Sequence, residues 1–323
     1  MTTRVHVTGA AGYAAAEALR WLHGHPLVEV GVVESRSHAG VRLGDHFPLL
    51  RDTPYRCAEA GSVLAAARPG DVAIVGGTDD ESRAIVPSLL EAGARTIDLS
   101  AQYRADASAA YGLCEWERDA IAGARLVANP GCYPTAALLA LLPLASLGNP
   151  RQIVIDAKSG ITGAGRRPRV ESLFAEVTGE IRAYGLEGHR HQPEIERALL
   201  TGGIGASVTF TPHVVPLARG MLVDAYAIFA EPIDVDAVRS AYERAYAASP
   251  FVRLLFDERA PSVAAVVGTN DAELRVDVQG SVVRAICAID NLGKGAAGQA
   301  VQNLNIMLAM PEESGFGNRV VVA

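Results

Sequence analysis

The chain has 323 residues, 49% of them hydrophobic and 20% charged, which is enough to bury the cores of two domains. The formal net charge is −7 and the sequence has no basic cluster, so its charge pattern does not favour a nucleic acid as partner. The apolar run at 136–147 contains Pro143 and is too short to span a bilayer, and the N-terminus enters a strand pattern at once, without a secretion signal. We therefore expect a globular, cytoplasmic protein that acts on a small molecule and binds neither nucleic acid nor membrane.

The four cysteines are widely spaced and form no C-x-x-C pair, which argues against a disulfide framework or a zinc ribbon. Cys57, Cys114 and Cys287 are interpreted as small buried residues. Cys132 differs from them, because it stands at the expected start of an apolar helix.

The first stretch of the chain predicts a strand at 4–8 and a helix at 13–23, joined by the turn Gly9-Ala10-Ala11-Gly12. In nucleotide-binding folds such a turn lets the backbone approach a pyrophosphate, which the positive end of the helix stabilises. A G-x-x-G turn alone is a weak signal, because any tight turn between strand and helix favours glycine. The candidate cofactor-binding residues in this stretch are Gly9, Ala11, Gly12, Tyr13 and Ala14.

The second expected strand, 28–33, ends in Glu34-Ser35-Arg36-Ser37. An acidic residue at this position holds the ribose 2′-hydroxyl of NAD, whereas an arginine suits the 2′-phosphate of NADP. Because Ser35, Arg36 and Ser37 together offer donors for a phosphate, we expect NADP (NADPH) in preference to NAD. Because Glu34 is acidic, NAD stays an alternative cofactor. The third interpretation of this stretch is a solvated turn of mixed charge.

Further strands at 72–76, 96–99 and 126–128, with helical stretches between them such as 81–92, predict a doubly wound parallel sheet of the Rossmann type. The last strand leads through Asn129-Pro130-Gly131 to Cys132. Ligands of such sheets bind at the carboxyl ends of the strands, and a helix N-terminus favours a thiolate. Cys132 is therefore a candidate nucleophile, with an inert buried thiol as the alternative.

A cysteine nucleophile beside a nicotinamide implies a thioester that accepts a hydride. Such chemistry needs an acid or base, and the stretch EGHRHQPEIE offers His189 and His191, followed by Glu194. The two histidines could also bind a metal, but their local sequence holds no evident third ligand. Catalysis is therefore favoured and no metal is expected.

The stretch KSGITGAGRRPR at 158–169 has the composition of an anion cradle, because it combines glycines and hydroxyls with the cation of Arg166. A flexible surface loop is the alternative. Arg104 and Arg219 are further candidate anion clamps.

Several motifs in this order resemble the N-acetyl-γ-glutamyl-phosphate reductase family of arginine biosynthesis, which belongs to the semialdehyde dehydrogenases. They are NPGCYPT at 129–135, SGITGAGR at 159–166, GHRH at 188–191 with PEI at 193–195, Pro212-His213, Pro216, Arg219-Gly220 and AIDNLGKGAAGQAVQNLNIM at 288–307. The resemblance covers almost the whole chain.

The resemblance implies NADPH-dependent reduction of N-acetyl-γ-glutamyl phosphate to N-acetylglutamate semialdehyde, with release of phosphate. Cys132 would attack the acyl phosphate and His189 would shuttle the proton. Further cofactor contacts would come from Ser159, Gly160, Gly163 and Asn291. Substrate contacts would come from Arg104, Asn129, Tyr133, Arg166, His191, Glu194 and Arg219.

We expect a dinucleotide-binding domain at 1–131, completed by 292–323, and a catalytic and oligomerisation domain at 132–291. Five alternating stretches predict a largely antiparallel sheet in an α+β fold for the second domain, at 153–158, 208–212, 221–229, 273–278 and 282–289. Such a sheet commonly forms the oligomer contact in enzymes of this kind, so a homo-oligomer, dimer or tetramer, is expected.

Three departures from the family pattern concern the cofactor. Ala15 replaces a third glycine of the turn, Glu34 is acidic, and VGGTDDE at 75–81 replaces an apolar strand followed by Leu-Pro-His-Gly. The three carboxylates would repel NADP phosphates if they pointed inward, but we expect them to cap the next helix. Two alternatives therefore stay open: the same chemistry on an aspartyl or carrier-linked aminoadipyl phosphate, and a non-catalytic NADP-binding homologue.

Overall fold

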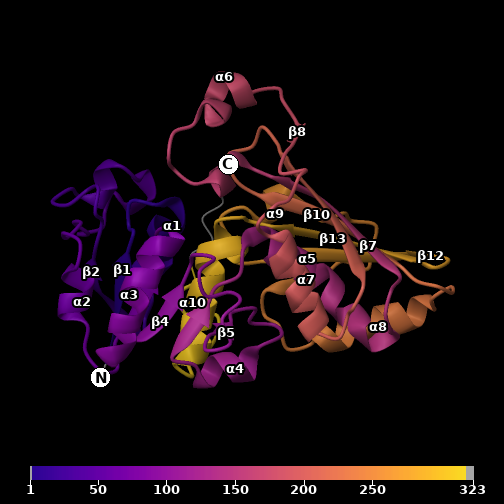
Figure 1. Cartoon of the computed structure of the whole chain (residues 1–323), viewed down its shortest axis with the longest axis horizontal. Coiled ribbons are helices and arrows are strands. Elements are labelled where there is room, and N and C mark those ends of the chain that lie inside the picture. The colour runs from indigo at the N-terminus through magenta and orange to yellow at the C-terminus, as the bar shows by residue number, and fades with distance from the viewer. Residues whose placement is uncertain (1, 318–323) are drawn as a thin grey trace. The chain divides into compact units, whose positions relative to one another are not determined.

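The computed structural model describes residues 2–317, which form two units (Figure 1). Among these residues, unit 1 contains 2–130 and 296–317, and unit 2 contains 131–295. Of the expected C-terminal domain segment 292–323, residues 318–323 lie outside the described part of the chain, as does Met1.

Unit 1 is built on a six-stranded parallel sheet in the order β2-β1-β3-β4-β6-β5. The strands are β1 (Thr3–Thr8), β2 (Val28–Val33), β3 (Val72–Val75), β4 (Arg95–Asp98), β5 (Ala110–Tyr111) and β6 (Leu126–Ala128). The helices are α1 (Tyr13–His23), α2 (Ser62–Ala66), α3 (Asp79–Glu91), α4 (Arg118–Gly123) and α10 (Gly298–Met307). The predicted doubly wound sheet is confirmed: β1 pairs with β2 on one side and with β3 on the other, which is the switch point of such folds.

Alternating side chains explain why helices cover both faces of this sheet. In β3, Val72 and Ile74 join the core cluster that includes residues of α1 and α10, whereas Ala73 and Val75 join the cluster that includes residues of α3. Both faces of the central strands are therefore apolar, as is usual in parallel sheets.

Unit 2 is built on a seven-stranded sheet in the order β11-β12-β13-β10-β7-β9-β8. The strands are β7 (Gln152–Ser159), β8 (Arg182–Ala183), β9 (Ser207–Val214), β10 (Met221–Ile228), β11 (Val252–Leu254), β12 (Ala272–Gln279) and β13 (Val282–Ile289). The helices include α5 (Cys132–Leu141), α6 (Phe174–Val177), α7 (Gln192–Thr201), α8 (Val235–Tyr246) and α9 (Val263–Val266). Only the pairs β7–β9 and β11–β12 are parallel among these strands, so the expected antiparallel-rich sheet is confirmed as a mixed one.

The two faces of this sheet differ. Along β10, Met221, Val223 and Ala225 are buried, and β10 packs against α5, whose residues after Cys132 are all buried. The alternate residues of β10, such as Asp224 and Tyr226, are only half-buried. One face thus carries the core of unit 2, and the other presents polar and aromatic side chains.

The strand register brings three connecting segments to one end of the sheet. Met221, the first residue of β10, pairs with Ser159 at the end of β7 and with Ile289 at the end of β13. The glycine-rich stretch after Ser159, the residues just before Met221 and the segment after Ile289 therefore lie side by side.

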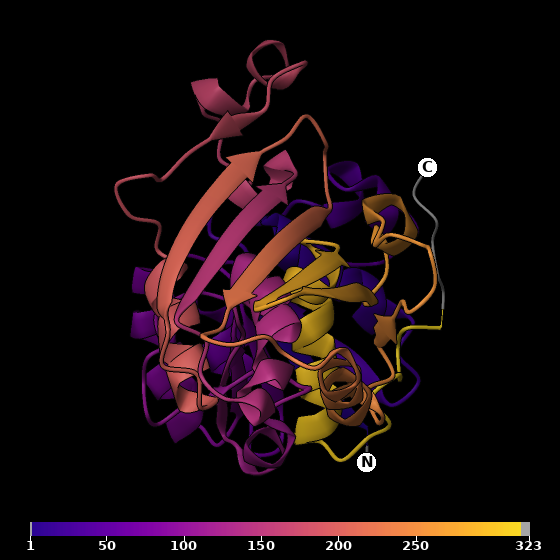
Figure 2. The same cartoon turned by 90° about the vertical axis from the view of Figure 1, so that its right-hand side faces the viewer.

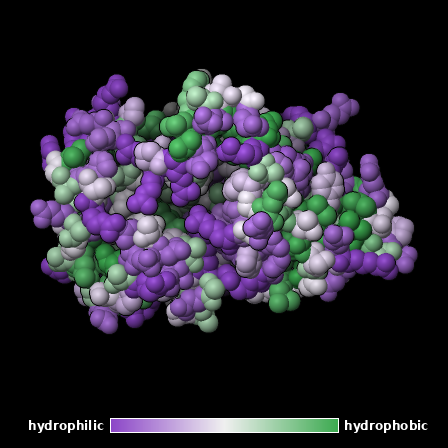
Figure 3. Space-filling view, turned by 45° about the horizontal axis from the view of Figure 1, so that its top comes forward, coloured by the Kyte–Doolittle hydropathy of each residue, from purple (hydrophilic) through white to green (hydrophobic). Residues whose placement is uncertain are grey.

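The segment between β7 and α7 extends away from the sheet at α6 and returns to it at β8, which pairs with β9 (Figures 1 and 2). It carries exposed apolar side chains: Phe174 is 84% exposed and Leu186 is 72% exposed. On the face in Figure 3, hydrophobic residues form small patches among predominantly hydrophilic ones. Within residues 2–317, no helix has both the length and the apolar character needed to cross a membrane.

Candidate functional site

Cys132 is the first residue of α5 and is half-buried. It follows β6 by a short connection, so its predicted place between a strand and a helix is confirmed. The N-cap Gly131 has no side chain to cap the helix, and the first turn of α5 contains no acidic residue. The positive end of this helix is therefore not neutralised by residues of its own first turn.

Gly295 lies directly against Cys132, in a π-helical turn at Gly293–Ala297. A Cβ atom placed on Gly295 would be 2.8 Å from the Cβ of Cys132, which is closer than real contacts allow. The room around the thiol therefore depends on the missing side chain at this position.

Glu194 holds the backbone just before the thiol. It lies in the first turn of α7, is buried, and its Oε1 accepts a hydrogen bond of 2.9 Å from the N–H of Gly131. The contact joins α7 to the start of α5 within unit 2.

His189 and His191 lie at the start of α7, where His191 is the N-cap. The N–H of His191 donates to Nδ1 of His189 over 3.1 Å, and the two rings are 4.9 Å apart. Because Nδ1 accepts, the neutral ring of His189 carries its proton on Nε2. Burial, together with the charge of Arg190, lowers the pKa of His189 from its usual 6.5, so the neutral form dominates at pH 7.

Tyr133 connects the thiol-bearing helix to these histidines. Its ring meets His189 edge-on, with centroids 5.7 Å apart, and His191 at 5.8 Å. The Tyr133 hydroxyl donates to the His213 carbonyl over 3.1 Å and accepts from the Tyr184 hydroxyl over 3.2 Å. The fold therefore packs His189 against the residue next to Cys132, although the two are far apart in sequence.

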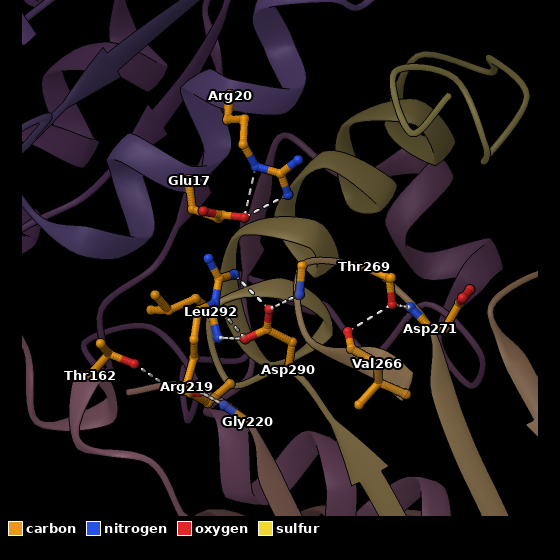
Figure 4. Close-up of polar contacts among 12 residues, drawn as sticks. Glu17, Arg20, Thr162, Arg219, Gly220, Val266, Thr269, Asp271, Asp290 and Leu292 are labelled. Carbon is orange, nitrogen blue, oxygen red and sulfur yellow. Dashed lines mark hydrogen bonds and ion pairs between the residues drawn. The ribbon is translucent and has the colours of Figure 1, made fainter. Parts of the chain in front are cut away.

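Arg219 forms an ion pair with the fully buried carboxylate of Asp290 (Figure 4). The Arg219 Nη2 lies 2.6 Å from Oδ2 and its Nε lies 3.2 Å from Oδ1, which is a two-bond arrangement. The same carboxylate accepts from the N–H groups of Gly268, over 2.7 Å, and Leu292, over 3.0 Å. The Asp290 side chain is fully buried and that of Arg219 is 12% exposed, so the guanidinium is held in one orientation.

Asn291, the next residue, joins two of the predicted segments. Its Oδ1 accepts from the Gly220 N–H over 2.6 Å, and its Nδ2 donates to Thr162 Oγ1 over 2.9 Å. Gly163 lies close to both Asn291 and Ser159, and Gly160 lies against the backbone of Arg219. The structure thus brings together Ser159, Gly160, Gly163, Arg219 and Asn291. Arg166 follows in the same stretch and is half-buried.

In unit 1, the glycine turn after β1 has the predicted geometry. Gly9 has a φ of +63°, and a Cβ there would collide with the carbonyl oxygen of Gly76. Gly12 is the N-cap of α1 and provides no side-chain cap, and the first turn, with Tyr13, Ala14 and Ala15, has no acidic residue. A pyrophosphate fits this backbone cradle, because no side chain of the cap or the first turn puts a carboxylate there. Ala15 is buried and lies near Gly76.

The residues after β2 divide into buried and exposed ones. Ser35 is buried, whereas Arg36 and Ser37 are exposed. The carboxylate of Glu34 is buried and accepts from the N–H of Val63, in α2, over 2.8 Å. Arg36 pairs with Glu81 over 2.8 Å.

The acidic stretch at 79–81 caps α3, as predicted. Thr78 is the N-cap and forms a capping box with Glu81, while Asp79 accepts from the N–H of Ala101. Asp80 pairs with Arg83 on the helix surface.

Arg104 and Asn129 also contact each other, in unit 1. Arg104 Nε donates to the Asn129 carbonyl over 2.9 Å, while the Asn129 side chain donates to the Ala296 carbonyl and accepts from Asn303. These contacts hold the connection that precedes Cys132, and the roles of both residues toward substrate stay predictions.

Sequence reasoning missed Asp290, Tyr184 and the partnership of Arg36 with Glu81. Asp290 had a signal, because a carboxylate that directly ends an apolar strand is out of place unless it is paired. Among the described residues, no group of three or more His, Cys, Asp and Glu side chains could hold a metal ion.

Two family descriptions match the chain. Residues 4–124 match the family described as "Semialdehyde dehydrogenase, NAD binding domain", and residues 132–291 match "Semialdehyde dehydrogenase, dimerisation domain". The N-acetyl-gamma-glutamyl-phosphate reductases of Geotalea daltonii and Pelobacter propionicus are 42% and 41% identical to it, each over 97% of both chains.

Solved structures of lower identity share the fold. Aspartate semialdehyde dehydrogenase II of Vibrio cholerae, complexed with ASA, superposes with a TM-score of 0.77 at 17% identity, over 96% of this chain and 99% of that one. The aspartate semialdehyde dehydrogenase with NADP from Candida albicans gives a TM-score of 0.73 at 16% identity, with the same coverage.

Proposed function

Because this chain belongs to the N-acetyl-gamma-glutamyl-phosphate reductase family, we propose that it reduces N-acetyl-γ-glutamyl phosphate to N-acetylglutamate semialdehyde and phosphate, using NADPH. The observation that carries the proposal is the position of Cys132. The thiol is on the first residue of a helix whose N-cap, Gly131, has no side chain, it has space left by Gly295, and it neighbours the Tyr133 ring that packs against His189.

Cys132 is the nucleophile of this proposal. Its thiolate forms a C–S bond to the acyl carbon while the C–O bond to phosphate breaks, and phosphate leaves with that electron pair. When bound, a reduced nicotinamide supplies the hydride. Cys132 retakes the electron pair of the C–S bond as the aldehyde leaves, so the thiolate is regenerated.

His189 is the proposed partner of Cys132. With its proton on Nε2, the neutral ring can donate a hydrogen bond to the acyl oxygen as negative charge develops there. The leaving phosphate takes up one proton, because the acyl phosphate, NADPH and H⁺ together give the aldehyde, NADP and phosphate. His189 therefore has two proposed roles, as hydrogen-bond donor to the acyl oxygen and as the proton shuttle expected from the sequence, and the second stays a prediction.

Anionic groups of the substrate would be held by Arg219 and Arg166, with Ser159 and Gly160 nearby. Support comes from the orientation that Asp290 imposes on the Arg219 guanidinium. Tyr133, His191 and Glu194 would shape the same site through the contacts between α5 and α7.

The cofactor would lie on unit 1, with its pyrophosphate at Gly9–Ala14 and its ribose near the end of β2. Two observations favour NADP over NAD. The Glu34 carboxylate is buried and hydrogen-bonded to the Val63 N–H, whereas the Arg36 guanidinium is exposed. A phosphate can reach such a guanidinium.

The half-buried polar and aromatic face of the mixed sheet would form a homo-oligomer contact. The matched description as a dimerisation domain supports this proposal. The choice between dimer and tetramer and the cytoplasmic location stay predictions.

The test is the reverse assay, with N-acetylglutamate semialdehyde, phosphate and NADP, following NADPH absorbance. We expect phosphate-dependent turnover that falls by about 10³-fold or more in Cys132→Ser. Cys114→Ser is the matched control, because a serine can keep the hydrogen bond to Asn303 and activity should persist.

Absence of turnover by folded native protein would refute the assigned substrate. Aspartate semialdehyde in the same assay tests the closest alternative substrate class. Nucleotide binding without turnover on either substrate would favour a non-catalytic homologue.

A further inference from the structure

The ion pair between Arg36 and Glu81 joins the two sequence features of unit 1 that bear on the choice of cofactor. The Arg36 Nη2 lies 2.8 Å from Glu81 Oε1, and the side chains are 75% and 35% exposed. Arg36 is the cation expected to meet the 2′-phosphate of NADP, and Glu81 belongs to the stretch that departs from the family pattern.

The orientation of Glu81 is fixed by the start of α3. Its Oε2 accepts from the Thr78 N–H over 2.8 Å, and its own N–H donates to Thr78 Oγ1 over 3.3 Å. A Cβ on Gly77 would be 2.5 Å from Oε2, so the glycine leaves the space in which this carboxylate lies. The capping box thus holds the charge in place whether or not Arg36 is bound to it.

This carboxylate belongs to a turn that lies beside the nucleotide cradle. The Gly76-Gly77 backbone packs against Gly9, and the Ala10 N–H donates to the Glu34 carbonyl over 3.0 Å, which joins the cradle to the end of β2. The two neighbouring acids have other partners, because Asp79 accepts from Ala101 and Asp80 pairs with Arg83. Glu81 is therefore the acid of this stretch that is paired with Arg36.

We propose that Glu81 is a specificity-determining residue that competes with the 2′-phosphate of NADP for Arg36, and so narrows the preference for NADP over NAD. The proposal rests on the nicotinamide cofactor of the proposed function. An exposed ion pair contributes little and can open, so the doubly charged phosphate can displace Glu81 from the guanidinium. The displaced carboxylate stays bound to Thr78 close by, and its repulsion weakens the binding of the phosphate. NAD has no phosphate at this position and is unaffected.

The test measures dissociation constants of NADP and NAD by calorimetry for native protein and Glu81→Gln. Glutamine can keep the capping box, so the variant removes the charge and not the helix start. We expect the Kd of NADP to fall by about fivefold, as for one screened charge a few ångströms away, and that of NAD to stay the same. Asp80→Asn is the matched control, since it removes a negative charge from the same turn, but one that is paired with Arg83 and not with Arg36. It should leave the ratio of the two constants unchanged.

Arg36→Gln completes the set and should weaken NADP binding while leaving NAD binding as it was. An unchanged or weaker NADP affinity in Glu81→Gln would overturn the inference, as would an equal gain for NAD. If both nucleotides bind the native protein and only this ratio fails to move, the proposed function stands and the inference falls. If neither nucleotide binds, both fall.

Discussion

Two arginine–carboxylate pairs stand at the two candidate sites, and they are built differently. In unit 2, Arg219 donates two hydrogen bonds to Asp290, whose fully buried carboxylate also accepts from two backbone N–H groups. Arg36 and Glu81 in unit 1 are more exposed, and their ion pair joins Nη2 to Oε1 over 2.8 Å. The first pair fixes one geometry, whereas the second can open when another anion arrives.

The energies of the two pairs should differ accordingly. Removing one partner of a buried pair costs about 3–5 kcal/mol, because the remaining charge is left without water or counter-charge. An exposed pair contributes about 0–1 kcal/mol. Substrate geometry can therefore depend on the first pair, and cofactor preference can be adjusted through the second.

The largest effect on stability is expected for Asp290→Ala. It removes the buried carboxylate that pairs with the Arg219 guanidinium and accepts from the Gly268 and Leu292 N–H groups, so the free energy of unfolding should fall by about 3–5 kcal/mol. Urea denaturation measures this loss. Glu81→Ala is the comparison and should cost about 1 kcal/mol, mostly through the lost cap. Equal losses in the two variants would remove the distinction between the pairs.

A smaller effect is expected for Gly295→Ala, which tests how rigid the surroundings of Cys132 are. The new Cβ would press on Cys132 and cost about 1–3 kcal/mol of stability, and misplacing the thiol should lower kcat by about tenfold or more. Gly123→Ala, where no atom lies within 4 Å of the added Cβ, is the control. Native kcat in Gly295→Ala would show that the backbone here can move aside.

The smallest effect is expected for Arg190→Gln. Burial is the larger cause of the lowered His189 pKa and remains, but the nearby cation that also lowers it is lost, so the pKa should rise. Protonation puts a hydrogen on Nδ1 that opposes the His191 N–H, so activity is lost as pH falls through this pKa. The acid limb of kcat/KM against pH should therefore move to higher pH in the variant. If the acid limb stayed in place or moved to lower pH, the protonation of His189 would not be the cause of that limb.

Much of the fold follows from local pattern. The alternation in 282–289 predicted a strand with the bounds of β13, and the spacing in 13–23 predicted α1, because these periods act over a few residues. The helix start at Cys132 was predictable for the same reason, since a strand, a glycine and an apolar run with Pro134 near its start specify it locally.

The sequence by itself thus determined the strand–turn–helix units, the place of Cys132 and the capping role of the acidic stretch, because turn and helix-end chemistry involve near neighbours. Tertiary structure decided which charges meet. Arg219 and Asp290 are 71 positions apart in the sequence. They come together because Met221 of β10 pairs with Ile289 of β13, so the residues just before Met221 and just after Ile289 lie at the same end of the sheet. Arg36 meets Glu81 because β2 and β3 flank β1 and the segments after them lie together. Strand order and register depend on the packing of the whole unit, so no local pattern could have supplied these pairs.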